Sequence, residues 1–271
     1  VLFVTAKAEV EDEAKGFAVG GADYLVKPIS PPIVLARVKT HLALHDQKRH
    51  LADQVAERTA QIAERNQELN ATRLEVIHQL GRASEFRDNE TGMHIIRMSR
   101  YAALLAKRAG LSEPEVELIE HAAPMHDVGK IGVPDHILLK PGKLTAEEFK
   151  VIKTHSEIGY RIIGEQPAEL LALGGLIAYT HHEKWDGTGY PRGLKEEEIP
   201  LAGRICAIAD VFDALTSSRP YKQGWSVDRA MTLVAEEGGR HFDPQLAPKF
   251  VALRSDIEAI MAEHQDATAE V

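Results

Sequence analysis

The sequence predicts a mainly α-helical protein in which strands are confined to a short segment at the start. Three observations support this fold class. Apolar residues recur at helical spacing after residue 77, a heptad pattern precedes them, and short apolar runs typical of strands occur within residues 1–41. We therefore expect a small α/β segment over residues 1–41, a helical linker over residues 42–76 and an all-α domain over residues 77–271.

The first part of the chain alternates between strand and helix patterns. The expected order is β-α-β-α, with elements at Val1–Val4, Asp12–Val19, Ala22–Val26 and about Pro32 to Leu44. This order resembles the second half of a response-regulator receiver domain, where Thr5 and Lys27 would match the switch hydroxyl and the phosphate-contacting lysine. The first half of that domain, with the aspartate that accepts the phosphoryl group, is absent from the sequence. We therefore expect a fragment of a longer protein that is not phosphorylated in the receiver's way.

The linker shows a heptad pattern without glycine or proline. Apolar residues repeat every seven positions, and two leucines occupy the companion position of the seam: Val55, Ile62, Leu69 and Val76, with Leu44 and Leu51. Later companion positions are polar, at Arg58, Arg65 and Thr72. The pattern favours a two-stranded coiled coil that joins two copies of the chain in a homodimer. The alternative is a single amphipathic helix packed on its own domain.

The pattern over residues 77–271 predicts several helices, some with capping residues at their starts. Helices are expected at Arg97–Ala109, from Thr145 to about His155, at Ile199–Leu215, at Ser226–Glu237 and after Asp243-Pro244. Thr145 and Glu148 form a capping box, and Asp243 followed by proline is a typical helix start.

Composition narrows the possible partners. A net charge of −9 argues against a general nucleic-acid surface. No uncharged apolar run is long enough for a membrane span, and Val1 is not followed by a signal-peptide pattern. The single cysteine, Cys206, allows no internal disulfide, which favours a cytoplasmic protein. An anionic substrate would therefore need bound metal ions and a few well-placed Lys or Arg side chains.

Histidines and aspartates gather at four places in the all-α domain. These are His126-Asp127, which we expect on a helix, His155, the adjacent pair His181-His182, and Asp210 on an otherwise apolar helix. Imidazole and carboxylate together suit Fe, Mn or Zn, and so many ligands suggest more than one ion. Asp127 is the natural bridge, because a carboxylate has two oxygens. His126-Asp127 or His155 alone could be a packing or surface feature. The adjacent pair His181-His182 is harder to explain by packing, and a buried Asp210 would need a cation.

The order of these motifs, followed by the loop Trp185–Pro191 with its Gly-Tyr-Pro sequence, resembles the HD-GYP family of bacterial phosphodiesterases that hydrolyse cyclic di-GMP. The match runs from about Glu75 to about Asp256. The resemblance implies an all-α HD-type metallohydrolase domain and the following metal ligands: Glu90, His94, His126, Asp127, His155, His181, His182 and Asp210. Glu90 is lacking in some members, so its presence here implies a third ion. We expect two or three divalent ions, with Fe favoured and Mn possible.

The same resemblance implies roles in catalysis and substrate binding. Tyr190 of the loop and the basic pair Arg219 and Lys222 would bind substrate, although Tyr190 could instead be a packing residue and the basic pair part of a solvated loop. Lys130 and Asp213 are candidates for proton transfer to the leaving 3′ oxygen or for positioning the substrate, beside ions bridged by Asp127. The expected reaction is hydrolysis of cyclic di-GMP to pGpG and then GMP.

Two other functions remain open at this point. The domain could be a metal-containing receptor for cyclic di-GMP, or an interaction module that recruits a GGDEF-type or other signalling protein through the Gly-Tyr-Pro loop. It could also be an HD-type nucleotidase. The loop after His182 argues against the nucleotidase, and the complete set of ligands argues against a receptor without turnover.

Overall fold

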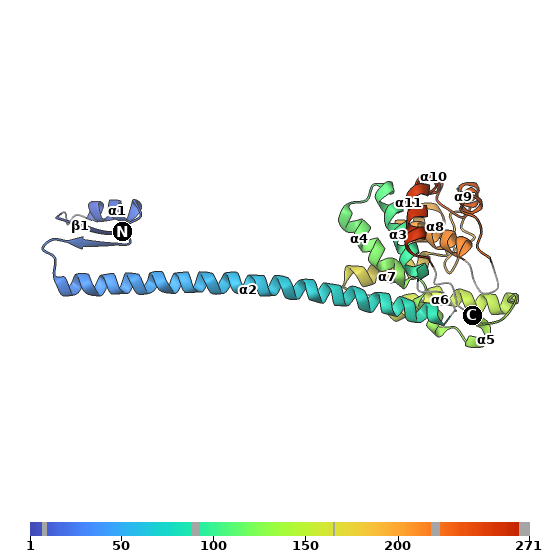
Figure 1. The fold of residues 1–271 in the computed structure, drawn as a ribbon, viewed down its shortest axis with the longest axis horizontal. Coiled ribbons are helices and arrows are strands. Elements are labelled where there is room, and N and C mark those ends of the chain that lie inside the picture. Colours follow the sequence, from blue (N-terminus) through green and yellow to red (C-terminus); the bar gives the residue numbers. More distant parts are fainter. Residues whose placement is uncertain (7–9, 88–92, 165, 218–222, 266–271) are drawn as a thin grey trace. The chain divides into compact units, whose positions relative to one another are not determined.

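The computed structural model describes residues 1–271 except 7–9, 88–92, 165, 218–222 and 266–271 (Figure 1). The chain divides into two compact units, Val1–Asn70 and Ala71–Val271. The helix α2 (Pro31–Phe86) contributes residues to both. Within the described residues, no helix combines the length and the apolarity that crossing a membrane requires.

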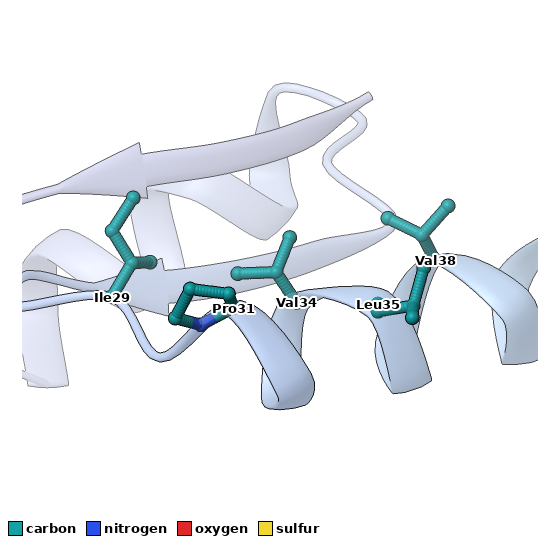
Figure 2. A pocket seen from close by; sticks show the side chains of 5 residues that line it. All are labelled: Ile29, Pro31, Val34, Leu35 and Val38. Atoms are coloured by element: carbon teal, nitrogen blue, oxygen red, sulfur yellow. The ribbon is translucent and has the colours of Figure 1, made fainter.

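The first unit contains the predicted strands and helices in the predicted order. Strands β1 (Leu2–Thr5) and β2 (Asp23–Val26) pair in parallel, and the connection between them contains α1 (Val10–Ala18). Asp23 accepts a hydrogen bond of 2.7 Å from Arg37 near the start of α2. An apolar hollow lies beside that start and is lined by Ile29, Pro31, Val34, Leu35 and Val38 (Figure 2).

A single helix replaces the separate helix and linker expected from the sequence. α2 runs without interruption through the predicted boundary near residue 42. The residues of the heptad seam are exposed along it, and 64%, 61% and 57% of the surfaces of Val55, Ile62 and Leu69 remain accessible to solvent. Its last turns, in contrast, are buried on one face, at Ile77, Gly81, Ser84 and Glu85. The helix therefore has an uncovered apolar stripe in its middle and a packed end.

The second unit is the predicted all-α domain. Its central helices are α3 (Met93–Ala109), α4 (Glu113–Ala122), α6 (Ala146–Ile163), α7 (Glu169–Thr180) and α8 (Leu201–Thr216). α3 packs against α4 and α8, and α6 packs against α7. Smaller helices complete the unit: η1 (Ala123–Met125), η2 (Val128–Gly132), α5 (Asp135–Leu138), η3 (Glu196–Glu198), α9 (Val227–Glu236), α10 (Leu246–Val251) and α11 (Arg254–Glu263).

Aromatic packing joins the C-terminal helices to the central ones. Tyr101 of α3, Phe212 of α8 and Phe250 of α10 are fully buried. Their rings meet edge to face, with centroids 5.6 Å apart for Tyr101 and Phe212 and 5.2 Å apart for Phe212 and Phe250. This geometry is the favourable one for aromatic pairs, and it anchors α8, which carries Asp210.

Three sequence-based placements differ from the structure. His126 and Asp127 lie between two 3-10 helices, η1 and η2, and not on an α-helix. His155 lies within α6, which continues to Ile163, although Thr145 caps this helix as predicted. The helix predicted after Asp243 starts only at Leu246, because the Asp243 carboxylate accepts a bond from the backbone of Gln245 and forms a turn.

The backbones of η2 and α6 approach very closely. A Cβ atom on Gly129 would lie 1.8 Å from the carbonyl oxygen of His155, so no residue larger than glycine fits there. Gly159, one turn later on α6, packs against the same glycine. This contact brings the segment with Asp127 beside the helix that carries His155.

We predict that Gly129→Ala destabilises the domain by about 2 kcal/mol or more, because the added methyl group forces η2 away from α6. The matched control is Gly175→Ala on α7, where a Cβ atom would make ordinary contacts of 3.5 Å. That change should be neutral or stabilising, since alanine is the better helix former. Urea unfolding of both variants measures the difference, and equal stabilities would contradict the close approach.

Candidate metal centre

Three buried histidines are held in one tautomer by carbonyl groups of their own helical turns. The Nδ1 atoms lie 3.0 Å from Ala123 O for His126, 2.7 Å from Ile152 O for His155 and 3.0 Å from Ile177 O for His181. A carbonyl oxygen only accepts, so each Nδ1 carries a hydrogen, and in the neutral ring each Nε2 presents a lone pair. Histidines that bind metal ions are usually oriented in this way.

The two oxygens of Asp127 face two different groups of imidazoles. Oδ1 lies 3.1 Å from His155 Nε2 and 3.6 Å from His181 Nε2. Oδ2 lies 3.4 Å from His126 Nε2 and 2.7 Å from Lys130 Nζ. Burial alone would raise the pKa of Asp127, but the positive charge of Lys130 holds this pKa well below its ordinary value. The carboxylate therefore stays ionised, and it lies between the two groups.

Several atoms at this centre suit a metal ion better than a hydrogen bond. His126 Nε2, His181 Nε2 and Asp127 Oδ1 are buried, and none of them has a hydrogen-bond partner among the residues that the structure describes. Leaving such atoms unsatisfied is costly, whereas cations bound beside Asp127 would satisfy them. Asp127, His155, His181 and His182 each direct one ligand atom to within 4.8 Å of the others. The donor set fits a divalent metal ion.

His182 completes this first group. Its ring centroid lies 3.9 Å from that of His181 and 5.0 Å from that of His155. Burial and the neighbouring imidazoles lower the pKa of His182 well below its usual value. A neutral ring keeps a nitrogen lone pair available for a metal ion at neutral pH.

A second group lies on the other side of Asp127. Glu85, His94 and His126 direct ligand atoms to within 4.8 Å of one another. Asp210 Oδ1 lies 3.6 Å from His94 Nε2 and 3.8 Å from His126 Nε2. Glu85 was not among the residues predicted from the sequence. Its signal was the spacing of four that it shares with Ile77 and Gly81, which places all three on the buried face of α2.

Asp213 is buried behind His94 and does not face the open side of the centre. Its side chain is fully enclosed, and it accepts hydrogen bonds from Arg97 Nε at 2.7 Å, from His94 Nδ1 at 2.8 Å and from Ser217 Oγ at 2.9 Å. Burial opposes ionisation, but the bonds from His94 and Arg97 lower the pKa of Asp213 to about 2. The geometry therefore favours orientation of His94 over the proton transfer expected for Asp213 from the sequence.

The low pKa of Asp213 has a consequence for stability. A carboxyl group whose pKa is lowered on folding stabilises the folded state above its unfolded pKa of about 4. This contribution is lost as the pH falls from about 4 towards 2, the folded-state value.

The Gly-Tyr-Pro loop is held by a residue that the sequence analysis also missed. Glu183 is buried at 2% exposure and accepts hydrogen bonds from the backbone of Arg192 at 2.8 Å and of Leu194 at 3.0 Å. Its only sequence signal was its position directly after His182. These bonds close the loop, and the ring of Tyr190 lies 4.7 Å from that of His182. Tyr190 therefore lies beside His182 of the candidate metal centre.

Close backbone contact also shapes this loop. A Cβ atom on Gly189 would lie 2.3 Å from the backbone nitrogen of Lys184, and Gly187 has a φ of +81° that favours glycine. Lys153 of α6 places its ammonium group 4.9 Å from the centre of the Tyr190 ring. The edge of the centre next to Tyr190 thus carries a positive charge that an anionic ligand could contact.

The structure brings together most of the residues selected from the sequence. Gathered around Asp127 are the following side chains: His94, His126, Lys130, His155, His181, His182, Tyr190 and Asp210, with Asp213 behind them. Glu90, Arg219 and Lys222 lie outside the described residues.

Comparison with known proteins agrees with this centre. Residues 49–246 match the model of a protein family described as HD domain. The chain is similar to the cyclic di-GMP phosphodiesterase response regulator RpfG of Xanthomonas campestris, with 40% identity over 99% of this chain and 71% of the relative. It is also similar to a cyclic di-GMP phosphodiesterase of Thermotoga maritima, with 39% identity over 98% of this chain and 74% of the relative.

A solved structure shares the fold. It is a cyclic GMP-AMP specific phosphodiesterase of Vibrio cholerae, with a TM-score of 0.53 and 18% identity over 72% of this chain and 51% of that chain. At this identity the likeness concerns the fold alone. The family match and the relatives at about 40% identity show that the chain belongs to the HD domain family of metal-dependent hydrolases.

Proposed function

We propose that this protein is a metal-dependent phosphodiesterase that hydrolyses cyclic di-GMP to pGpG and then to GMP. The observation that carries the proposal is the Asp127 carboxylate, which lies between two groups of buried imidazole and carboxylate ligands. Two ligand groups that share one carboxylate are typical of hydrolases with adjacent metal ions. The choice of cyclic di-GMP is supported by the names of the relatives that cover most of this chain.

Different residues of the centre bind the metal ions, donate a proton and bind the substrate. Divalent ions bound here would lower the pKa of a water molecule and neutralise charge that develops on phosphorus. Lys130, 2.7 Å from Asp127 Oδ2, is the candidate donor of a proton to the leaving 3′ oxygen. Arg219 and Lys222 bind the non-bridging phosphate oxygens, since a guanidinium group can form two parallel bonds to phosphate. Tyr190 contacts the substrate from the loop.

Asp213 acts in this proposal through His94. The bond from His94 Nδ1 to the Asp213 carboxylate directs His94 Nε2 towards Glu85 and Asp210. Arg97 in turn holds the carboxylate with two nitrogen atoms. A carboxylate behind a histidine ligand fixes the ring orientation and strengthens metal binding.

The donors favour iron, with manganese as the second choice, and two or three ions per chain. All ligand atoms in the two groups are nitrogen or oxygen. Cys206, the single cysteine, is buried in α8, and burial raises the pKa of its thiol. Cys206 belongs to neither ligand group, so a sulfur ligand, one of the features that select zinc, is missing from both groups.

The first test is the metal content. Protein prepared without oxygen should contain about two or more Fe or Mn ions per chain, and His181→Ala or Asp127→Ala should lose metal and activity together. His136→Ala, on the exposed side of α5, is the matched control and should keep both. Full activity of metal-free protein would refute the metal-dependent reaction.

The second test concerns substrate and product. Cyclic di-GMP should yield pGpG first and GMP on longer incubation, and Arg219→Ala should slow both steps by about tenfold or more, because it removes a charged phosphate contact. Chromatography of the time course, with 3′3′-cyclic GMP-AMP and GMP mononucleotide substrates in parallel, measures this. Release of phosphate from mononucleotides without consumption of cyclic di-GMP would favour a nucleotidase. Binding of cyclic di-GMP without turnover would favour a receptor.

The loop between His182 and Pro191 offers a site for a signalling partner. Asp186 and Thr188 at its tip are exposed, and Asp186 accepts hydrogen bonds from Thr188 that keep the tip in one turn. We propose that a GGDEF-type or other signalling protein docks here, next to the metal centre.

The chain also carries features of a signalling protein outside the metal centre. In our proposal, residues 1–41 are the second half of a receiver domain, 42–76 a coiled-coil linker and 77–271 the HD-GYP domain. The backbone nitrogen of Lys27 donates a bond of 2.8 Å to Thr5 O, so the two residues matched to the receiver lie side by side. The exposed stripe of α2 supports a homodimer, since burying that stripe against a second copy would stabilise it.

If α2 forms a coiled coil, charged residues in its seam should prevent dimerisation. Ile62→Asp with Leu69→Asp should convert a dimer into a monomer, because the seam cannot bury unpaired charges. Ala60→Asp with Gln67→Asp adds the same charge two positions earlier on the outer face of the helix and should leave the dimer intact. Analytical ultracentrifugation distinguishes the two, and a starting protein that is monomeric would disprove the homodimer.

A further inference from the structure

The last turn of α2 is in direct contact with the segment that carries His126 and Asp127. A Cβ atom on Gly81 would lie 2.7 Å from Pro124 O, so the two backbones touch. Ser84 Oγ donates a bond of 2.7 Å to the backbone oxygen of Asp127. Just past the helix, Arg87 donates a bond of 3.0 Å to Val133 O. Three contacts therefore hold the end of α2 against the segment that carries the metal ligands.

Glu85 lies within this contact and directs its carboxylate into the second ligand group. The residue is buried at 1% exposure, and its Oε1 atom lies 3.6 Å from His94 Nε2. Asp210 Oδ1 is also 3.6 Å from that nitrogen atom, and His126 offers a ligand atom within 4.8 Å of the ligand atoms of Glu85 and His94. Glu85, His94 and His126 thus converge on one point, and Asp210 lies beside the two imidazoles.

The spacing of these atoms fits a shared ion. Distances of 3.6 Å are too long for hydrogen bonds between nitrogen and oxygen. Two ligand atoms bound to one metal ion at about 2.1 Å are about 3.4 Å apart in tetrahedral geometry. The observed separations are close to that value.

The orientation of His94 points to the same conclusion. Its Nδ1 atom bonds to Asp213 at 2.8 Å, so the neutral ring presents the lone pair of Nε2 towards Glu85 and Asp210. A lone pair that faces two carboxylates is repelled by them unless a cation lies between. The alternative arrangement is a doubly protonated His94 with no ion, and metal analysis separates the two.

We infer that Glu85 is a ligand of the ion that His94 and His126 hold, so that the last turn of α2 supplies part of the metal centre. The inference rests on the proposed metal-dependent function and makes it more specific. The helix with the exposed heptad stripe then contributes a ligand directly. It also differs from the resemblance-based expectation, in which Glu90 fills this role.

Metal analysis of site variants and a control tests the inference. Glu85→Gln should contain about one ion fewer per chain than the unmodified protein, as His94→Ala should, while the group around His155 keeps its ion. Glu75→Gln is the matched control, because Glu75 is exposed on the same helix and should leave the count unchanged. Glu90→Gln is measured beside them. The readout is metal per chain by mass spectrometry, with circular dichroism to check folding.

A conservative variant keeps the test decisive if Glu85→Gln unfolds. Glu85→Asp retains the charge on a shorter side chain. In a titration with Mn²⁺, the affinity of this variant for the ion held by His94 and His126 should fall by about tenfold or more. Full metal content in Glu85→Gln, or an unchanged affinity in Glu85→Asp, would overturn the role of Glu85 alone. An unmodified protein that binds no metal would overturn the proposed function as well.

Discussion

The centre of this protein depends on one carboxylate, Asp127, that remains ionised in a buried site. Its two oxygens face His155 and His181 on one side and His126 on the other. A buried negative charge is costly unless cations surround it, and here Lys130 contributes one at 2.7 Å. Divalent ions would supply the rest. The same charge therefore explains both the convergence of the histidines and the kind of ligand that the site can hold.

Backbone carbonyl groups orient the histidines that surround that carboxylate. The Nδ1 atoms of His126, His155 and His181 are bonded to carbonyl oxygens of their own turns, which leaves each Nε2 free to bind. Gly129 lets the Asp127 segment touch α6, and Glu183 closes the loop that brings Tyr190 to the centre. Positions set by backbone contacts and buried bonds are rigid, as a metal centre requires.

Prediction from the sequence succeeded where a residue type is unusual in its local pattern. Adjacent histidines, an aspartate on an apolar helix and a glycine-rich loop stand out, and the structure brings His181, His182, Asp210 and Tyr190 together. It failed for Glu85, Glu183 and Arg97, because glutamate and arginine are common on helix and loop surfaces. Their burial beside the candidate metal centre distinguishes them from surface residues, and burial depends on which elements pack together.

The sequence by itself determined the helical fold class, the heptad stripe of α2 and the choice of most candidate metal ligands, because helical periodicity and residue chemistry are local properties. Only the tertiary structure decided where those ligands lie. The contacts of Gly129 with α6 and of Ser84 with the Asp127 backbone hold His126-Asp127 between two 3-10 helices. The Arg97–Asp213 pair likewise forms between α3 and α8. Such contacts join residues far apart in the chain, and their spacing leaves no trace in local patterns.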